Sequence, residues 1–389
     1  MSNRRGFKDN SFWLHPSYSL DVISGNKIAD PFIQISDGQI VTISNHPNQS
    51  NQIIELPGVT LLPGLIDAHT HLTYHFDANN HFGKGNPSFE QLYDGGVDNA
   101  EATLNSGFTT VRDLGAPGQV IFRIRDEIYD GQLAGPQRIA TGPRILASGD
   151  PLMPDQIEQA PDLERLVSQH IFDGADVIKV FLDADDDGNV PLSSEEMELI
   201  VDVAADFNRK VAVHAHDAVS AKLAIQAGAA SIEHGTFLDS EAIQMMVDNG
   251  TFLVPTLYLP DHYLKNRSQF TFPPDAWDFF NKMKTNGIKS AAKAIKAGVK
   301  IAYGTDAVAG ISGNNCREFE YLMKAGMTPM EALQSATTNA AELLGLDDLI
   351  GQITPGYLAD LVGIKGEISN PKSYENVVFV MSEGNIIRQ

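Results

Sequence analysis

The sequence predicts an α/β protein, a (β/α)8 TIM barrel with a small β-sandwich domain built from both termini. Short apolar segments alternate with helix-like segments eight times through the middle of the chain. Both ends are instead β-like, with short runs broken by Asn, Asp, Gly and Pro. The length of 389 residues and the hydrophobic content of 42% suit one barrel-sized domain and a smaller one.

The N-terminal part contains only short β-like runs and no helical period. These runs are Tyr18–Ser24, Phe32–Ser36, Gln39–Ser44 and Gln52–Leu56. The same pattern returns near the C-terminus in Gly351–Ile353, Ala359–Lys365 and Val377–Met381. Because chain ends often lie close together, we assign residues 1–63 and 346–389 to the small domain and residues 64–345 to the barrel.

The barrel strands are expected to be short, apolar and bounded by polar residues or Gly, as parallel strands buried on both faces are. The strand candidates are Leu65–Ala68, Thr109–Asp113, Arg138–Thr141, Val177–Phe181, Val211–His214, Ser231–His234, Phe252–Leu257 and Lys300–Thr305. The helix candidates include Phe89–Ser106, Leu163–Phe172, Ser194–Phe207, Ala218–Ala227, Ser240–Asn249 and Asp275–Ala297. Ser194 and Ser240 precede acidic residues, as helix N-caps do. Eight such units favour a barrel over a doubly wound sheet.

The charge and the termini exclude several classes of protein. The chain has 28 Lys and Arg against 50 Asp and Glu, a formal net charge of −22 that repels nucleic acid and anionic membranes. The single cysteine, Cys316, cannot form an internal disulfide. The first residues lack the apolar core of a signal peptide, and no apolar stretch is long enough to span a bilayer. We expect a soluble, cytoplasmic protein with no nucleic-acid or membrane partner.

The apolar run 61–72 ends with His69 and His71, two positions apart. Side chains at i and i+2 of an extended segment point the same way, so both imidazoles can reach one metal ion. In a TIM barrel the active site lies at the C-terminal ends of the strands, where the polar residues should converge. Four His and one Asp suit Zn²⁺ or a similar first-row divalent ion. The residues expected at this end are His69, His71, Lys179, His214, His234 and Asp306.

Lys179 places an ammonium group inside an otherwise apolar strand. A buried charge must be paired or modified. One interpretation is an ion pair with a carboxylate such as Asp113 or Asp306. The other is a carbamylated lysine, because CO₂ added to the neutral amine makes a carboxylate that can bridge two cations.

Seven motifs in chain order resemble those of the amidohydrolase superfamily. They are PGLIDAHTH (63–71), GFTTVRDLG (107–115), VIKV (177–180), VHAH (213–216), IEHG (232–235), YGTDA (303–307) and GYLADL (356–361). Within the superfamily the chain resembles the imidazolonepropionase-like and prolidase-like branch. That branch includes Xaa-Pro and Arg/Lys carboxypeptidases and ochratoxin-type amidases, and the resemblance covers nearly the whole chain.

The resemblance implies two divalent ions, most simply Zn²⁺, bridged by N6-carboxylated Lys179. The remaining ligand sets that it implies are His69, His71 and Asp306 for one ion and His214 and His234 for the other. The expected reaction is hydrolysis of an amide or peptide bond in a dipeptide or N-acyl amino acid, as in a dipeptidase or carboxypeptidase. Asp306 is the expected catalytic residue, because it contacts both metal and water and can move the proton.

Other readings of the same site stay open. Such a site also attacks cyclic amides, lactones and phosphotriesters, and it supports deamination. A non-catalytic relative would have lost ligands, and all six are present. The expected partners are a small-molecule or dipeptide substrate and further copies of the chain in a homo-oligomer.

One departure from the branch concerns substrate binding. Many relatives carry a Gly-Gly-His segment after the third strand that resembles a carboxylate binder, whereas here residues 142–151 contain no histidine. Tyr258 follows strand seven, and His216 shares a face with His214, where a substrate-side role is favoured over ligation. The candidate substrate-binding residues are therefore Tyr258, His216, Tyr74 and Arg144, with His75 and His81 on the same loop as Tyr74.

The pocket is expected to have an apolar wall. Val254–Leu259 and the stretch Phe270–Phe280 would supply it and favour an apolar or aromatic C-terminal residue over Arg or Lys. Acidic residues such as Asp150 or Asp183 would instead attract a basic side chain. Asp183 also begins a run that mimics a calcium loop, but Ser194 at the twelfth position cannot supply a bidentate carboxylate, so we interpret the run as a solvated loop.

Overall fold

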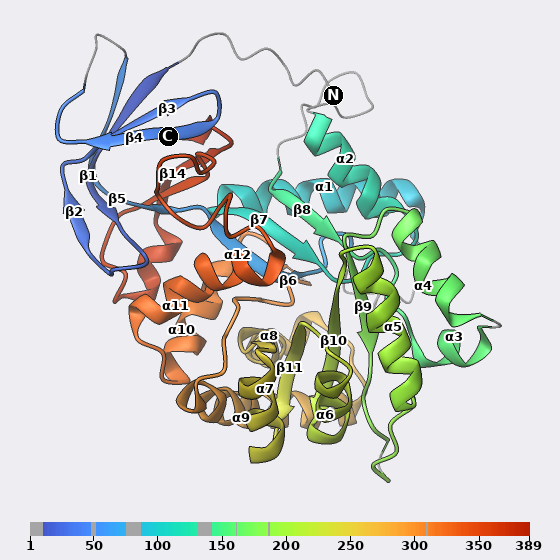
Figure 1. Cartoon of the computed structure of the whole chain (residues 1–389). Coiled ribbons are helices and arrows are strands. Elements are labelled where there is room, and N and C mark those ends of the chain that lie inside the picture. Colours follow the sequence, from blue (N-terminus) through green and yellow to red (C-terminus); the bar gives the residue numbers. More distant parts are fainter. Residues whose placement is uncertain are drawn as a thin grey trace.

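The computed structural model describes residues 11–47, 52–74, 87–130, 142–160, 162–185, 187–308 and 310–389. Figure 1 shows a small β domain, blue and red, beside a larger body in which helices surround parallel strands. The first and last parts of the chain thus meet in one domain, and the α/β architecture with a small β domain is confirmed.

The small domain is one eight-stranded sheet in the order β15-β14-β13-β5-β1-β3-β4, with β2 paired to β1. Strand β5 joins the two ends of the chain, because it runs parallel to β1 and antiparallel to β13. The strands are β1 (Phe12–Leu20), β2 (Lys27–Ala29), β3 (Phe32–Ser36), β4 (Gln39–Ser44), β5 (Ile53–Pro63), β13 (Leu361–Ile364), β14 (Val377–Ser382) and β15 (Asn385–Arg388).

This sheet curls until its edges approach each other. The β4 edge bonds to the segment that leads into β13, with Ile40 N donating to Tyr357 O at 2.9 Å. Gly38 and Gly384 stand where the β3–β4 and β14–β15 turns touch, and a Cβ on either would lie within 2.9 Å of backbone atoms. The layers expected of a sandwich therefore belong to one curled sheet around an apolar core that includes Leu14 and Phe379.

The barrel strands lie close to the expected segments, with three differences. The third strand is Arg144–Ala147, whereas the predicted segment Arg138–Thr141 lies outside the described residues. The seventh strand stops at Val254, before Pro255, which has no backbone N–H to donate. Residues 300–305 form no continuous strand. The strands are β6 (Leu65–Thr70), β7 (Phe108–Asp113), β8 (Arg144–Ala147), β9 (Val177–Phe181), β10 (Lys210–Asp217), β11 (Ser231–Phe237) and β12 (Phe252–Val254).

These strands form two parallel sheets, β6-β7-β8 and β9-β10-β11-β12, which isolated bridges connect. Leu152 bridges to Val180 between β8 and β9, and Leu253 bridges to Ile301 after β12. Ala307 then bridges back to Thr70 on β6, and Asp306 N donates to His69 O at 2.8 Å. Single backbone contacts thus bring residues 300–307 next to β6, where an eighth barrel strand belongs.

The helices follow the expected alternation. The N-caps of α5 and α7 are Ser193 and Asp239, one residue before the predicted Ser194 and Ser240, because their side chains accept the exposed N–H groups of the first turn. The helices are α1 (Phe89–Asn105), α2 (Val120–Asp130), α3 (Pro154–Gln159), α4 (Leu163–Phe172), α5 (Ser194–Asp206), α6 (Ala218–Gln226), α7 (Ser240–Asn249), α8 (Tyr258–Lys265), α9 (Pro274–Ala297), α10 (Glu318–Lys324), α11 (Pro329–Ser335) and α12 (Thr338–Leu344).

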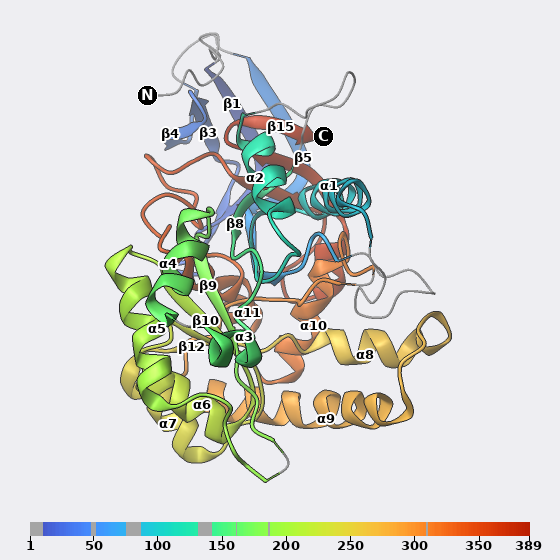
Figure 2. The same ribbon diagram turned by 90° about the vertical axis from the view of Figure 1, so that its right-hand side faces the viewer.

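Helices α8 and α9 lie side by side and extend to one side of the barrel (Figure 2). An aromatic cluster that includes Tyr263, Phe272, Trp277 and Phe280 packs between them. We call α8, α9 and this cluster the aromatic arm. Nowhere in the described part of the chain does a helix combine the length and the apolar composition that crossing a bilayer requires.

Candidate active site

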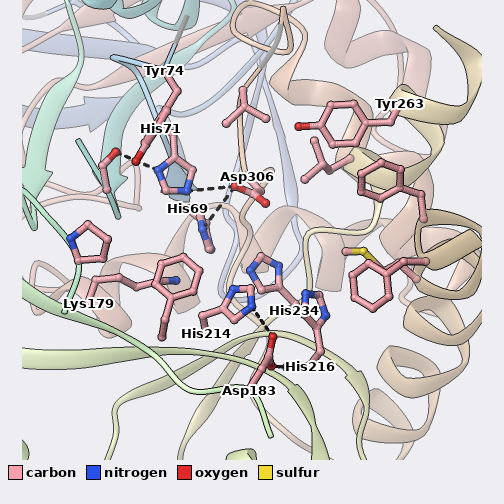
Figure 3. Close-up of a pocket in the computed structure, with 18 of the residues that line it drawn as sticks. His69, His71, Tyr74, Lys179, Asp183, His214, His216, His234, Tyr263 and Asp306 are labelled. Atoms are coloured by element: carbon pink, nitrogen blue, oxygen red, sulfur yellow. Dashed lines mark hydrogen bonds and ion pairs between the residues drawn. The ribbon is translucent and has the colours of Figure 1, made fainter. Parts of the chain in front are cut away.

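A cavity of about 440 Å³ opens where the barrel strands end. One wall is polar and comes from the ends of β6, β9, β10 and β11 and from Asp306 (Figure 3). The other wall is apolar and comes mainly from the aromatic arm. Its lining residues are His69, His71, Tyr74, Gly115, Pro151, Lys179, Phe181, Asp183, His214, His216, His234, Leu259, Tyr263, Ala276, Phe279, Phe280, Met283, Asp306 and Val308.

The cavity brings together every residue that the sequence predicted as a metal ligand. His69, His71 and Asp306 form one group of possible ligand atoms, and His214, His216 and His234 form another. Lys179 also lines the cavity. The two groups adjoin, since the rings of His69 and His234 lie 5.0 Å apart between centroids. Parallel strands place their C-terminal ends together, which explains why residues so distant in sequence meet here.

In the first group both imidazoles face Asp306. The Nε2 atoms of His71 and His69 lie 3.2 Å and 3.6 Å from Asp306 Oδ1. On the opposite side of each ring, His69 Nδ1 donates to Glu233 Oε2 at 2.7 Å and His71 Nδ1 donates to the carbonyl of Gly115 at 3.0 Å. A carboxylate and a carbonyl only accept, so these bonds leave the lone pairs on the Nε2 atoms, as a metal ligand requires.

Glu233 is fully buried next to this group. Its Oε1 accepts from Arg112 Nη2 at 2.9 Å and from the Ser231 hydroxyl at 2.5 Å. Burial alone would raise the pKa of Glu233, but Arg112 and His69 lower it to about 2. Glu233 is therefore a fixed anion that orients His69.

Two histidines of the second group are held by hydroxyl groups. His216 Nδ1 bonds Thr236 Oγ1 and His234 Nδ1 bonds Thr256 Oγ1, each at 2.7 Å. Burial lowers the pKa of His216 to about 3 and the pKa of His234 well below its usual value. These imidazoles are neutral, which is the form that binds metal.

Asp183 completes the polar wall beside His214. Its Oδ2 lies 2.9 Å from His214 Nε2, and its Oδ1 accepts from the backbone N–H of His216 at 2.7 Å. Burial alone would raise the pKa of Asp183, but the hydrogen bond from His214 lowers it to about 2. The side chain is 42% exposed, so this anion faces the open part of the cavity.

Lys179 lines the same cavity as the two groups and is only 1% exposed. Its Nζ has no hydrogen-bond partner among the described residues, and the ring of Phe181 lies 5.4 Å away. Burial lowers the pKa of Lys179 to about 8. No ion pair with Asp113 or Asp306 forms, which removes the simplest structural explanation for a charge in this strand.

Three residues at the strand ends have left-handed backbones although none is glycine. They are His234 (φ 72°), Thr256 (φ 48°) and Asp306 (φ 54°). Such conformations cost about 1–3 kcal/mol each, and proteins concentrate them at functional sites. Here these backbone conformations direct the side chains of His234 and Asp306 into the cavity.

The predicted substrate-binding residues divide into two sets. Tyr74 and His216 line the cavity. Arg144 begins β8, at the end of the strand away from the cavity, and its guanidinium pairs with Asp360 at 3.2 Å and Glu383 at 2.7 Å in the small domain. Tyr258 begins α8 outside the lining, and its hydroxyl contacts His262 Nδ1 at 3.2 Å. His75 and His81 lie outside the described residues.

Several site residues escaped the sequence reasoning. Glu233 could have been found from the sequence. It is an acidic residue inside the apolar strand 231–234, and, as for Lys179, a charge buried in such a strand must be paired or modified. Tyr263 could not be assigned to the cavity without the position of α8. The threonine partners of the histidines could not be found without the alignment of neighbouring strands. Asp183 was expected at the pocket as a possible partner for a basic side chain, but its hydrogen bond with His214 was not predicted.

The Amidohydrolase family model matches residues 60–388. The chain belongs to the amidohydrolase family. It is a hydrolase that acts on carbon–nitrogen bonds, as its enzyme relatives indicate. Members of this family generally use divalent metal ions, and the two ligand groups are candidate positions for them in this amidohydrolase.

Its relatives lie in the branch that the sequence indicated. Ochratoxinase from Aspergillus niger is 29% identical over 346 residues, which cover 78% of this chain and 70% of that protein. Imidazolonepropionase from Fusobacterium nucleatum is 25% identical over 400 residues, which cover 88% and 86% of the two chains. The crystal structure of a Xaa-Pro dipeptidase with bound methionine matches this amidohydrolase with a TM-score of 0.87 at 32% identity, covering 97% of this chain and 100% of that one.

Proposed function

We propose that this amidohydrolase is a binuclear metal-dependent enzyme that cleaves the amide or peptide bond of a dipeptide or an N-acyl amino acid. One observation carries the proposal: two groups of possible ligands, with imidazoles oriented by hydrogen bonds, adjoin beside a buried lysine whose Nζ has no hydrogen-bond partner among the described residues. A cationic lysine beside two metal ions would be repelled by both. A carbamate on its Nζ would instead supply an anion with one oxygen for each ion.

The donor set fits two divalent ions, most simply Zn²⁺. Nitrogen and carboxylate ligands suit zinc, and six ligands exceed what one four-coordinate ion uses. His69, His71 and Asp306 would hold one ion, and His214 and His234 the other, with Lys179 between them as N6-carboxylysine. Two such ions, when bound, lower the pKa of a shared water and polarise the scissile carbonyl.

Within this site Asp306 has the proton-transfer role. The neighbouring His69 and His71 hold its pKa well below the ordinary value, although burial alone would raise it. It is therefore an anion that can accept the proton of the attacking water and return it to the leaving amine. Its left-handed backbone and the hydrogen bond from its N–H to His69 O fix the carboxylate at the cavity wall.

The apolar wall supports a substrate with an apolar or aromatic residue. Leu259, Phe279, Phe280 and Met283 present hydrocarbon surface opposite the histidines. Tyr263 adds a hydroxyl directed towards the cavity (Figure 3), which is a suitable donor to a substrate carboxylate. The similarity to a Xaa-Pro dipeptidase and to an ochratoxinase supports a dipeptidase-like or carboxypeptidase-like reaction.

A second candidate is the hydrolysis of a cyclic amide. The 25% identity to an imidazolonepropionase over most of both chains favours it over deamination or the cleavage of lactones and phosphotriesters. Assembly into a homo-oligomer and a cytoplasmic location remain predictions from the sequence.

The test is a substrate screen with protein of known metal content. Enzyme reconstituted with zinc and bicarbonate is assayed by elemental analysis and then against dipeptides, N-acyl amino acids and cyclic amides. We expect about two ions per chain and turnover of the first two classes, with apolar C-terminal residues preferred. One ion per chain with an intact, bare Lys179 would overturn the binuclear site, and cleavage of cyclic amides alone would favour the second candidate.

A further inference from the structure

We infer that Asp183 binds the free α-ammonium group of the substrate, so that this enzyme prefers dipeptides to N-acyl amino acids. The inference rests on the proposed function and makes it more specific. It assigns the exposed carboxylate beside His214 to substrate recognition.

The position of Asp183 is the first step. It follows β9 on the polar wall, and its carboxylate lines the cavity next to His214. One oxygen is held by the backbone N–H of His216, which fixes the direction of the carboxylate without neutralising it. Figure 3 shows this group between His214 and His216, directed at the same cavity as the other site residues.

The second step concerns the proton on His214. The hydrogen bond of 2.9 Å from Nε2 to Asp183 Oδ2 needs a proton on that nitrogen. In a neutral ring this proton leaves the lone pair of His214 on Nδ1, so Nδ1 is the atom that can bind a metal ion. Asp183 therefore keeps an N–H donor at each oxygen, and among the described residues no Lys or Arg pairs with its carboxylate.

The third step is that the described cavity lining offers no free cation to pair with Asp183. Lys179 is its one Lys or Arg, and in the proposed site that residue is itself a carbamate anion. The other described lining residues with side-chain N–H groups are histidines. We therefore expect the cation that pairs with Asp183 to come with the substrate.

Substrate geometry then selects the kind of cation. In a dipeptide the α-ammonium group is one carbon away from the scissile carbonyl, so a group that binds it must lie beside the residues that surround that carbonyl. Asp183 meets this condition because it touches His214 and His216. An N-acyl amino acid has an uncharged acyl group in this place and leaves Asp183 without a cationic partner.

A matched pair of substrates tests the inference. Alanyl-phenylalanine and N-propanoyl-phenylalanine have the same scissile bond and differ only in the ammonium group. We expect wild-type enzyme to favour the dipeptide. Because a hydrogen bond to a charged group contributes about 1.5–3 kcal/mol, Asp183→Asn should lower kcat/KM for the dipeptide by about 10- to 100-fold and leave the propanoyl compound within about threefold.

Two further measurements separate recognition from metal binding. Elemental analysis should find the same metal content in Asp183→Asn as in the wild type. Calorimetry with the phosphinic analogues of both compounds should show that the variant loses its preference for the one with an amine. Asp187→Asn is the control, because it removes a charge from the same loop at an exposed residue outside the lining.

Other results would overturn the inference. Equal losses on both substrates, together with lost metal, would make Asp183 a residue that supports the metal site. A loss confined to substrates with Lys or Arg side chains would assign Asp183 to a basic side chain. If the wild type cleaves neither compound, the proposed function fails, and the calorimetric comparison then decides on Asp183 alone.

Discussion

The two ligand groups of the active site are oriented by different partners. His69 and His71 donate through Nδ1 to a carboxylate and a carbonyl, which can only accept. His216 and His234 bond instead to the hydroxyls of Thr236 and Thr256, which can donate or accept. The first group therefore has one defined tautomer before any ion arrives, whereas the hydroxyl partners of His216 and His234 permit either tautomer of those two rings.

This difference suggests two roles for the two groups. A preorganised group with a buried anion behind it should bind its ion more tightly and hold it in one geometry. The second group, with the exposed Asp183 beside His214, can adjust to the ion and to the substrate. The predictions below test this division, in order of decreasing effect.

The largest effect is expected for Asp306→Asn. An amide still offers an oxygen to an ion but cannot take up a proton, so the variant should keep much of its metal. Turnover should fall by about 10²–10⁴-fold. Steady-state kinetics alongside elemental analysis measures both quantities. Near-normal activity in a metal-replete preparation would exclude Asp306 from proton transfer.

Lys179→Ala should remove the bridge between the groups and at least one ion. The difference between the two ligand groups predicts that the ion retained is the one on His69, His71 and Asp306. Formate or acetate should restore part of the activity, because a small carboxylate can occupy the vacated space. For the wild type, apo-protein should recover faster with added bicarbonate than without it. A bare lysine found by mass measurement in fully active enzyme would contradict the bridge.

Glu233→Gln and Thr256→Val test the orienting partners directly. Loss of the buried anion behind His69 should weaken metal binding by about 10- to 100-fold, whereas loss of the hydroxyl behind His234 should have a smaller effect. Competition with a chromophoric chelator gives both affinities, and thermal unfolding checks that each variant folds. Thr256→Ser, which keeps the hydroxyl, is the control. Equal losses in the two variants would remove the distinction between the groups.

The smallest effect is expected at the apolar wall. Phe279 lines the cavity with 39% of its surface exposed, and its ring meets His216 edge-on at 5.3 Å. Phe279→Ala should raise KM for aromatic dipeptides by about 3- to 10-fold and change alanyl-alanine little, because a partly exposed ring buries limited apolar area. Phe172→Ala, at a residue 70% exposed, is the control for a surface aromatic. A uniform change across substrates would argue against a role in side-chain selection.

Sequence reasoning located the polar wall of the cavity because the C-terminal ends of the barrel strands form it. His69, Lys179, His214 and His234 each belong to a short apolar strand, and parallel strands in a barrel all end at the same face. No detail of loop structure was needed to bring them together.

Residues outside this rule were harder to place. Arg144 was assigned to the cavity because it follows the predicted strand, but it begins β8 instead and reaches the small domain. Tyr258 turns away because a helix starts there, and the same helix brings Tyr263 to the cavity. Local hydrogen bonds can move the end of a helix or strand by a few residues from its predicted position. A shift of that size turns a side chain to another face of the helix or strand.

The pairing of β5 with β13 has a consequence for how the chain folds. Pro63 pairs with Leu361, so roughly 300 residues of chain must be made before this edge of β5 finds its partner. Until then β5 is an eleven-residue strand with one edge open, the kind of surface on which aggregation begins. Synthesis of β13, β14 and β15 is thus the step that protects the sheet of β1–β5 from aggregation. Truncation after α12 should therefore yield aggregated rather than merely inactive protein.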